Sequence, residues 1–254
     1  MEKNYWPSWL VIAAVALGAV VLAITVHAVL RAKLAPKHGN TPETKTYLYT
    51  LPLRLWHWCN ALLFIGLTVS GFSKYFGILP KEIAGGAHRL LAMLFMAGWL
   101  YFITYNIVSG NGKNYIVKLK GFLGRCRAQA RYYLYGIMKG EAHPFKAEKG
   151  AKFNPLQQVT YTGLIYLMIP AFIITGMLIR NPAFGNLLWK SHILLGVAGI
   201  AFIIGHIYLC TTGSYKTQLV KGMIDGYHRH DEKAIDLPEE GLFLQQDEDI
   251  RLKV

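Results

Sequence analysis

The sequence has few acidic residues, and they are unevenly distributed. Only 14 of its 254 residues are Asp or Glu, against 27 Lys or Arg, and nine of the 14 acids follow Thr212. None of them lies inside a long apolar stretch. Relays that carry protons through membranes usually combine Asp, Glu and His, so the missing acids argue against a proton-transporting function.

Cysteine is also scarce. The three cysteines, Cys59, Cys126 and Cys210, form neither a CxxC pair nor a CxxCH sequence. Their spacing therefore gives no support to covalent c-type haem or to a zinc cluster. No stretch of the chain resembles a soluble domain of ordinary size.

Apolar sequence, by contrast, is abundant. Hydrophobic residues make up 53% of the chain. Five stretches are long enough to cross a hydrocarbon core of ~30 Å, for which about 20 apolar residues suffice. They cover residues 9–30, 55–76, 87–108, 158–179 and 187–211. We therefore expect an all-α membrane protein, with a kink in the fourth span at Pro170, because proline removes one helical hydrogen bond.

The positive charge indicates how the chain is oriented. A formal charge of +13 would indicate nucleic acid for a soluble protein, but here the basic residues lie between apolar stretches. Basic loops of membrane proteins stay in the cytoplasm. Assigning alternate segments to opposite sides gives 21 Lys and Arg on one side and six on the other. We expect a multi-pass membrane protein among membrane lipids, with its amino terminus outside, its carboxyl terminus in the cytoplasm and no nucleic-acid partner.

The last apolar stretch contains two histidines on one face. His192 and His206 are fourteen positions apart. This is nearly four whole turns and roughly 21 Å at ~3.6 residues per turn and ~1.5 Å per residue. Ionisable groups within spans are costly and usually functional. The helix therefore presents one imidazole near each membrane surface.

Two further histidines match these depths. His57 begins the second span at the inner surface, the depth of His206, and His88 begins the third span at the outer surface, the depth of His192. The sequence therefore predicts two pairs, His57 with His206 and His88 with His192. His27, near the inner end of the first span, is expected to be an interfacial histidine, because no other histidine pairs with it at that depth.

Paired histidines in a bundle core indicate haem. Imidazole is a good ligand for haem iron, and helix bundles hold such cofactors. The predicted fold is thus a four-helix haem-binding transmembrane bundle plus one extra N-terminal transmembrane helix, with two haem b groups. Arg54 precedes His57 by three residues on the same helical face, where its guanidinium can pair with a haem propionate.

Three parts of the chain follow from this organisation. Residues 1–46 form an N-terminal transmembrane helix and cytoplasmic linker, and residues 47–212 the dihaem four-helix core. Residues 213–254 form a cytoplasmic amphipathic segment and acidic tail. We expect a surface helix over 214–230 and a loosely ordered tail from Asp231.

Several short motifs resemble those of one known family. They are RLWH at 54–57, FNPLQQ at 153–158, ITGMLIR at 174–180, HIY at 206–208 and KGMIDG at 221–226. From about Tyr47 to His230 the chain resembles the membrane cytochrome b subunits of respiratory formate dehydrogenases, nickel–iron hydrogenases and thiosulfate reductases, within the bacterial cytochrome b561-like group. The KGMIDG run is most similar to the formate dehydrogenase gamma subunit. The first span has no counterpart in the usual four-helix pattern of this family.

The resemblance implies a function as well as a fold. It implies two b haems that carry electrons between a periplasmic redox partner and a quinone near the inner haem. The partner would be an iron–sulfur or multihaem cytochrome subunit, and quinone or quinol the substrate. We expect Asn106, at the inner end of the third span, and Gln158, at the start of the fourth, to donate hydrogen bonds to a quinone oxygen. We assign no catalytic residue, and whether the chain is itself an enzyme stays open.

Two other functions stay open at this point. One is a stand-alone transmembrane reductase similar to the ascorbate-linked cytochromes b561, which have a similar four-histidine core. The other is a non-redox membrane anchor or transporter. Haem quantified per polypeptide distinguishes the cytochromes from an anchor or transporter.

Overall fold

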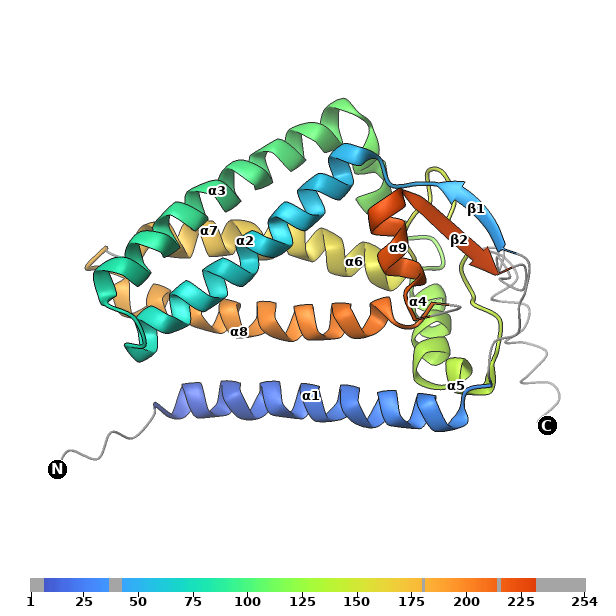
Figure 1. The fold of residues 1–254 in the computed structure, drawn as a ribbon, viewed down its shortest axis with the longest axis horizontal. Helices are drawn as coiled ribbons and strands as arrows, with labels where there is room; N and C mark the ends of the chain where they lie inside the picture. Colours follow the sequence, from blue (N-terminus) through green and yellow to red (C-terminus); the bar gives the residue numbers. More distant parts are fainter. Residues whose placement is uncertain (1–6, 37–42, 180, 214–215, 232–254) are drawn as a thin grey trace. The chain divides into compact units, whose positions relative to one another are not determined.

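The computed structural model describes residues 7–36, 43–179, 181–213 and 216–231. Five of its helical segments are long and apolar enough to cross a membrane (Figure 1). They are Ser8–Leu34 (α1), Leu51–Phe76 (α2), Lys81–Val108 (α3), Pro155–Leu178 (α6, η3 and α7) and Gly185–Cys210 (α8). The predicted class, an all-α membrane protein with five spans, is confirmed. Most of the predicted acidic tail, residues 232–254, lies outside the described residues.

Each span begins earlier than its apolar stretch. The largest difference is in α3, which begins at Lys81, six residues before the predicted start at Ala87. Hydropathy detects only the part of a helix that lies in hydrocarbon, and polar first turns lie outside it. Proline at a helix start is favourable because its missing N–H has no intrahelical partner there, and Pro52 occupies the first turn of α2.

The chain divides into two compact units. The first comprises residues 1–48, 114–162 and 197–254, and the second residues 49–113 and 163–196. In the second unit, α2 and α3 form an antiparallel hairpin, and Gly77 ends α2 with a left-handed backbone (φ 67°) (Figure 1). At the open end of this hairpin, Trp56 stacks on the fully buried Phe102, with ring centroids 3.5 Å apart, and donates its indole N–H to the Gly98 carbonyl. These contacts fix the register of the hairpin.

The fourth span accommodates its proline with a π-helical turn. The α-helical segments Pro155–Gly163 (α6) and Ile169–Leu178 (α7) flank the π-turn Leu164–Met168 (η3), in which the Ile169 N–H bonds the Leu164 carbonyl. Continuing this pattern, the Ile165 carbonyl would require the N–H of residue 170, which proline lacks. Trp99 Nε1 donates to that carbonyl instead, at 2.9 Å. The perturbation predicted at Pro170 thus takes the form of a π-turn just before it.

In the first unit, α1 is fixed at its carboxyl-terminal end by polar contacts. His27 Nδ1 lies 2.5 Å from the Tyr208 hydroxyl, and His27 Nε2 lies 2.8 Å from the Tyr133 carbonyl oxygen. Arg31 Nη2 donates to the Thr211 carbonyl at 2.9 Å. Both ring nitrogens of His27 are engaged, as expected for an interfacial histidine rather than a metal ligand.

The segment between α3 and α6 contains only short helices. They are a 3-10 turn over Asn111–Tyr115 (η1), α4 over Phe122–Arg131, a π-turn over Tyr132–Gly136 (η2) and α5 over Ile137–Lys139. Tyr133, in the π-turn, is half-buried, and burial of its hydroxyl raises its pKa to about 12. It therefore stays protonated at neutral pH and accepts a hydrogen bond from Asn154 Nδ2 at 3.1 Å.

The segment after α8 differs from the single surface helix predicted over 214–230. Within the described residues, α9 covers only Gln218–Asp225, and it ends at Gly226, whose φ of 89° favours glycine. Strand β2 (Tyr227–Asp231) follows and pairs antiparallel with β1 (Glu43–Tyr47). Amphipathic periodicity did not reveal the strand, because its hydrogen-bonding partner lies about 180 residues earlier in the chain.

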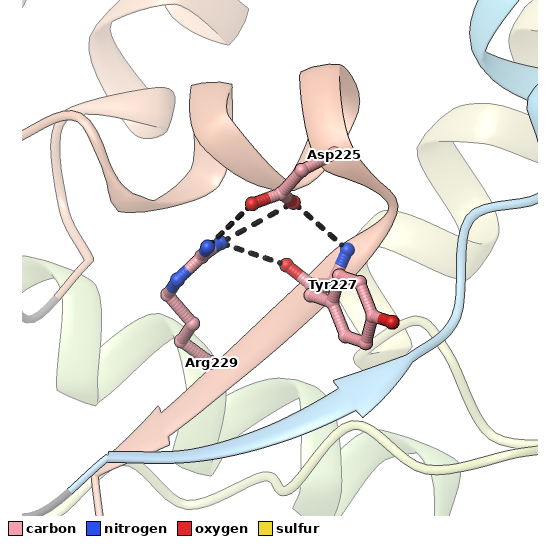
Figure 2. Close-up of polar contacts among 3 residues, drawn as sticks. All are labelled: Asp225, Tyr227 and Arg229. Atoms are coloured by element: carbon pink, nitrogen blue, oxygen red, sulfur yellow. Dashed lines mark hydrogen bonds and ion pairs between the residues drawn. The ribbon is translucent and has the colours of Figure 1, made fainter.

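A local polar cluster holds the junction between α9 and β2 (Figure 2). The Asp225 carboxylate accepts the Tyr227 backbone N–H at 3.0 Å and forms an ion pair with Arg229. Arg229 also donates to the Tyr227 carbonyl, at 3.2 Å. Hydrogen bonding from Arg229 lowers the pKa of the Asp225 carboxyl below its usual value.

Asp225→Asn is expected to loosen this strand pair. The ion pair is partly exposed, so the loss is roughly 0.2–1 kcal/mol. Because the folded-state pKa of Asp225 is lowered, its stabilisation is present above the ordinary carboxyl pKa and is lost as pH falls through the folded value. Hydrogen–deuterium exchange of β1 and β2 amides measures this; Glu148→Gln, which removes the long Lys146–Glu148 pair, is the control. Equal protection in the Asp225 variant and the control would contradict the prediction.

Candidate functional site

His88 and His192 come together in the second unit. His88 lies on α3 and His192 on α8, and both are half-buried. Their ring centroids are 6.1 Å apart, and the ring planes are nearly perpendicular, at 79°. Among residues 7–36, 43–179, 181–213 and 216–231, no group of three or more His, Cys, Asp or Glu could hold a metal ion. The two imidazoles therefore lie side by side within the second unit, and their role as a ligand pair stays a prediction.

The Nδ1 atom of each histidine faces a hydroxyl on a neighbouring helix. His88 Nδ1 lies 3.1 Å from both Ser70 Oγ and the Leu67 carbonyl oxygen. His192 Nδ1 lies 2.9 Å from Thr175 Oγ1. Each hydroxyl donates its own proton to a carbonyl four residues earlier, at 2.7 Å for Ser70 and 2.6 Å for Thr175. The hydroxyl oxygens therefore accept, and Nδ1 carries the proton in both rings.

This arrangement leaves the Nε2 lone pair of each imidazole for a metal. Histidine ligands characteristically donate their other ring N–H to an oxygen, which fixes the tautomer and the ring orientation. Sequence reasoning did not identify Ser70 and Thr175 as part of the site. The detectable signal was the repeated hydroxyl–glycine dipeptide, Ser70-Gly71 on α2 and Thr175-Gly176 on α7.

The two glycines of these dipeptides make room for the imidazoles. A Cβ atom at Gly71 would lie 3.1 Å from His88 Cε1, and one at Gly176 would lie 3.2 Å from His192 Cε1. Both distances are tighter than ordinary carbon–carbon contacts. A larger residue at either position would displace the ring, so glycine is needed for the close approach.

The separation of the two rings fits one iron between them. If both imidazoles bind one metal from opposite sides, with each nitrogen about 2 Å from it and each ring centre roughly 1 Å further, the centroids stand about 6 Å apart. The observed separation is 6.1 Å. Phe172 contacts His192 edge-on at 5.7 Å and supplies an apolar wall beside it.

The other two predicted ligands belong to different units, and each is described by itself. His57, in the second unit, contacts Trp58 edge-on, with centroids 5.0 Å apart. His206, in the first unit, stacks on Phe202 at 5.6 Å, and its Nε2 lies 3.8 Å from Cys210 Sγ. Arg54 is half-buried, one turn before His57 on α2. Their pairing around a second haem stays a prediction.

The two predicted quinone contacts are both buried. Asn106, on α3, is 2% exposed; its Oδ1 accepts a hydrogen bond from Asn111 Nδ2 at 2.6 Å, while its Nδ2 has no acceptor among the described residues. Gln158, on α6, is 6% exposed, and within the described ranges its Nε2 reaches only the Asn114 carbonyl, at 3.5 Å. Asn106 thus retains an unused donor, and Gln158 a weakly used one.

Comparison with known proteins identifies the family of this chain. Residues 48–226 match the family described as prokaryotic cytochrome b561, close to the 47–230 range of the motifs. The chain is 42% identical over 238 residues to the putative cytochrome YdhU of Escherichia coli (strain K12), which covers 89% of this chain and 91% of the relative. It is 23% identical over 218 residues to a probable Ni/Fe-hydrogenase B-type cytochrome subunit of Cupriavidus necator. This match covers 72% of this chain and 86% of the relative. The chain therefore belongs to the prokaryotic cytochrome b561 family, membrane electron-transfer proteins that bind haem b.

Proposed function

We propose that this cytochrome carries electrons across the bacterial inner membrane between a periplasmic redox partner and the quinone pool, using two b haems. The observation that carries the proposal is the His88–His192 pair, with its 6.1 Å separation and its Nδ1 atoms engaged. These residues would hold the outer haem. Bound haem iron supplies reversible one-electron transfer, chemistry that side chains alone do not provide.

A second haem is supported by matching separations on two helices. On α2, His57 precedes Gly71, which contacts His88, by fourteen residues; on α8, His192 precedes His206 by the same number. Each spacing corresponds to roughly 21 Å along a helix. His57 on α2 and His206 on α8 therefore lie equally far along their helices from the positions that contact or form the His88–His192 pair. We assign His57 and His206 to the inner haem, with Arg54 for a propionate.

The direction and the partners are part of the same proposal. The uneven charge supports a cytoplasmic carboxyl terminus and a position of His88 near the periplasm. The relative named as a hydrogenase B-type subunit supports a membrane-associated redox partner, which we take to be an iron–sulfur or multihaem cytochrome subunit. Asn106 and Gln158 are proposed as donors to a quinone oxygen near the inner haem. The division into parts 1–46, 47–212 and 213–254 also stays a prediction.

Haem quantified per polypeptide tests the proposal. The purified full chain is expected to contain two haems b, to give a reduced-minus-oxidised difference spectrum and to be reduced by a quinol. A ratio of one haem per chain would contradict the dihaem assignment. No haem at all would favour a membrane anchor, and two haems that quinol does not reduce would favour the stand-alone reductase.

A further inference from the structure

Two cationic side chains converge near the turn of the α2–α3 hairpin. A Cβ atom at Gly85, on α3, would lie 3.5 Å from Arg89 Nη1 and 3.6 Å from both Cδ and Cε of Lys74, which comes from α2. The two side chains therefore lie over the same buried glycine. Glycine allows both to approach the backbone of α3 at this point.

These two cations have no anionic partner in the described part of the chain. Neither Lys74 nor Arg89 makes a hydrogen bond or ion pair there, and Glu82, one turn before Gly85, is paired with neither. Both residues are exposed, so an anion can reach them, and two positive charges over the same glycine repel each other. An anion bound between them would remove the repulsion and satisfy both.

The cations lie one helical turn from the histidine pair. Lys74 follows Gly71, the residue that contacts His88, by three positions on α2. Gly85 precedes His88 by three positions on α3. Both steps lead towards the turn of the hairpin and cover about 5 Å. A haem carries two carboxylates on one edge, and a haem held at His88 could turn that edge towards both side chains.

We propose that Lys74 and Arg89 bind the propionate carboxylates of the haem held by His88 and His192. This inference rests on the proposed function, because it requires a haem at that pair. Arg89 can bind a carboxylate through two parallel N–H groups, and Lys74 contributes a compact point charge. Sequence reasoning assigned such a role only to Arg54, at the opposite end of α2.

The test is the midpoint potential of this haem. Lys74→Gln, Arg89→Gln and the double variant are made in the full chain carrying His57→Ala, which is expected to retain only this haem, and are studied in nanodiscs of phosphatidylcholine alone. Reduction adds negative charge to the haem, and nearby cations stabilise that charge. Removing either cation should therefore lower the midpoint potential of the haem. For the double variant we expect a tenfold change in the ratio of oxidised to reduced haem at fixed potential, equal to 59 mV for one electron.

Matched controls decide the outcome. Lys81→Gln removes one positive charge from the start of α3, as each single variant does, and should change the ratio far less than either, while Lys74→Arg should keep the parent potential. A double variant indistinguishable from Lys81→Gln would overturn the inference. So would a difference that appears only after phosphatidylglycerol is added, since the cations would then bind lipid phosphate. A different result would show that the proposed function itself is wrong: the chain carrying both His57→Ala and His88→Ala would then still retain its haem.

Discussion

Alanine in place of either His88 or His192 is expected to leave one haem per chain instead of two. The ring centroids lie 6.1 Å apart, so the two imidazoles together would hold one haem, and a haem deprived of one of them would have no second imidazole to replace it. Both variants should lose the same haem and should no longer accept electrons from a donor on the periplasmic side. His57→Ala and His206→Ala should remove the other haem.

Pyridine haemochrome quantification and difference spectra measure these losses in the purified variants. His27→Ala is the matched control: it removes a histidine from a span, but both nitrogens of that ring are already engaged by Tyr208 and Tyr133. Haem content should not change in it. Loss of one and the same haem in the His57 and the His192 variants would show that the pairing is wrong.

Asn106→Ala is expected to slow quinone reduction by roughly 10- to 100-fold, because a buried hydrogen bond of ~1–3 kcal/mol would be lost. The buried Nδ2 of Asn106 has no acceptor in the described ranges, which makes it the strongest candidate donor to a quinone oxygen. Haem content and the haem spectra should stay unchanged. Rates of haem oxidation by a soluble quinone, measured by stopped flow, give the effect.

Asn111→Ala separates a quinone contact from a packing effect. This variant removes the 2.6 Å hydrogen bond to Asn106 Oδ1 and leaves Asn106 Nδ2 in place. If only the Asn106–Asn111 contact mattered, both variants would slow the reaction equally. The placement itself fails if a quinone analogue perturbs the spectrum of the haem lost in His88→Ala and not that of the haem lost in His57→Ala.

Features that extend over whole helices could be predicted from the sequence of this protein. Hydropathy located all five spans, since lipid requires long apolar helices. Matched depths singled out His88 and His192, whose ring centroids lie 6.1 Å apart, while their binding of one haem stays a prediction. Ser70 and Thr175 could not be found this way. A hydroxyl that bonds its own helix is ordinary in a span, and only the position of the neighbouring helix shows that it also accepts from a histidine.

Local sequence periodicity also gave a wrong prediction for the segment after α8. The run after α8 has amphipathic spacing, and the prediction of one helix over 214–230 was wrong because α9 ends at Asp225 and the last four residues of the run belong to Tyr227–Asp231, which pairs with Glu43–Tyr47. Pairing between distant segments leaves no local signal in either one. The response to Pro170 likewise depended on Trp99, whose side chain replaces the missing backbone donor.

The pairing of β1 with β2 has a consequence for biosynthesis. The second strand is translated about 180 residues after the first, so the two cannot meet until the last span has left the ribosome. Closing so long a loop is costly in chain entropy and becomes favourable only when the intervening helices are already inserted. The strand pair is therefore a late step of assembly. A chain truncated before Tyr227 would insert its spans with Glu43–Tyr47 still lacking its hydrogen-bonding partner.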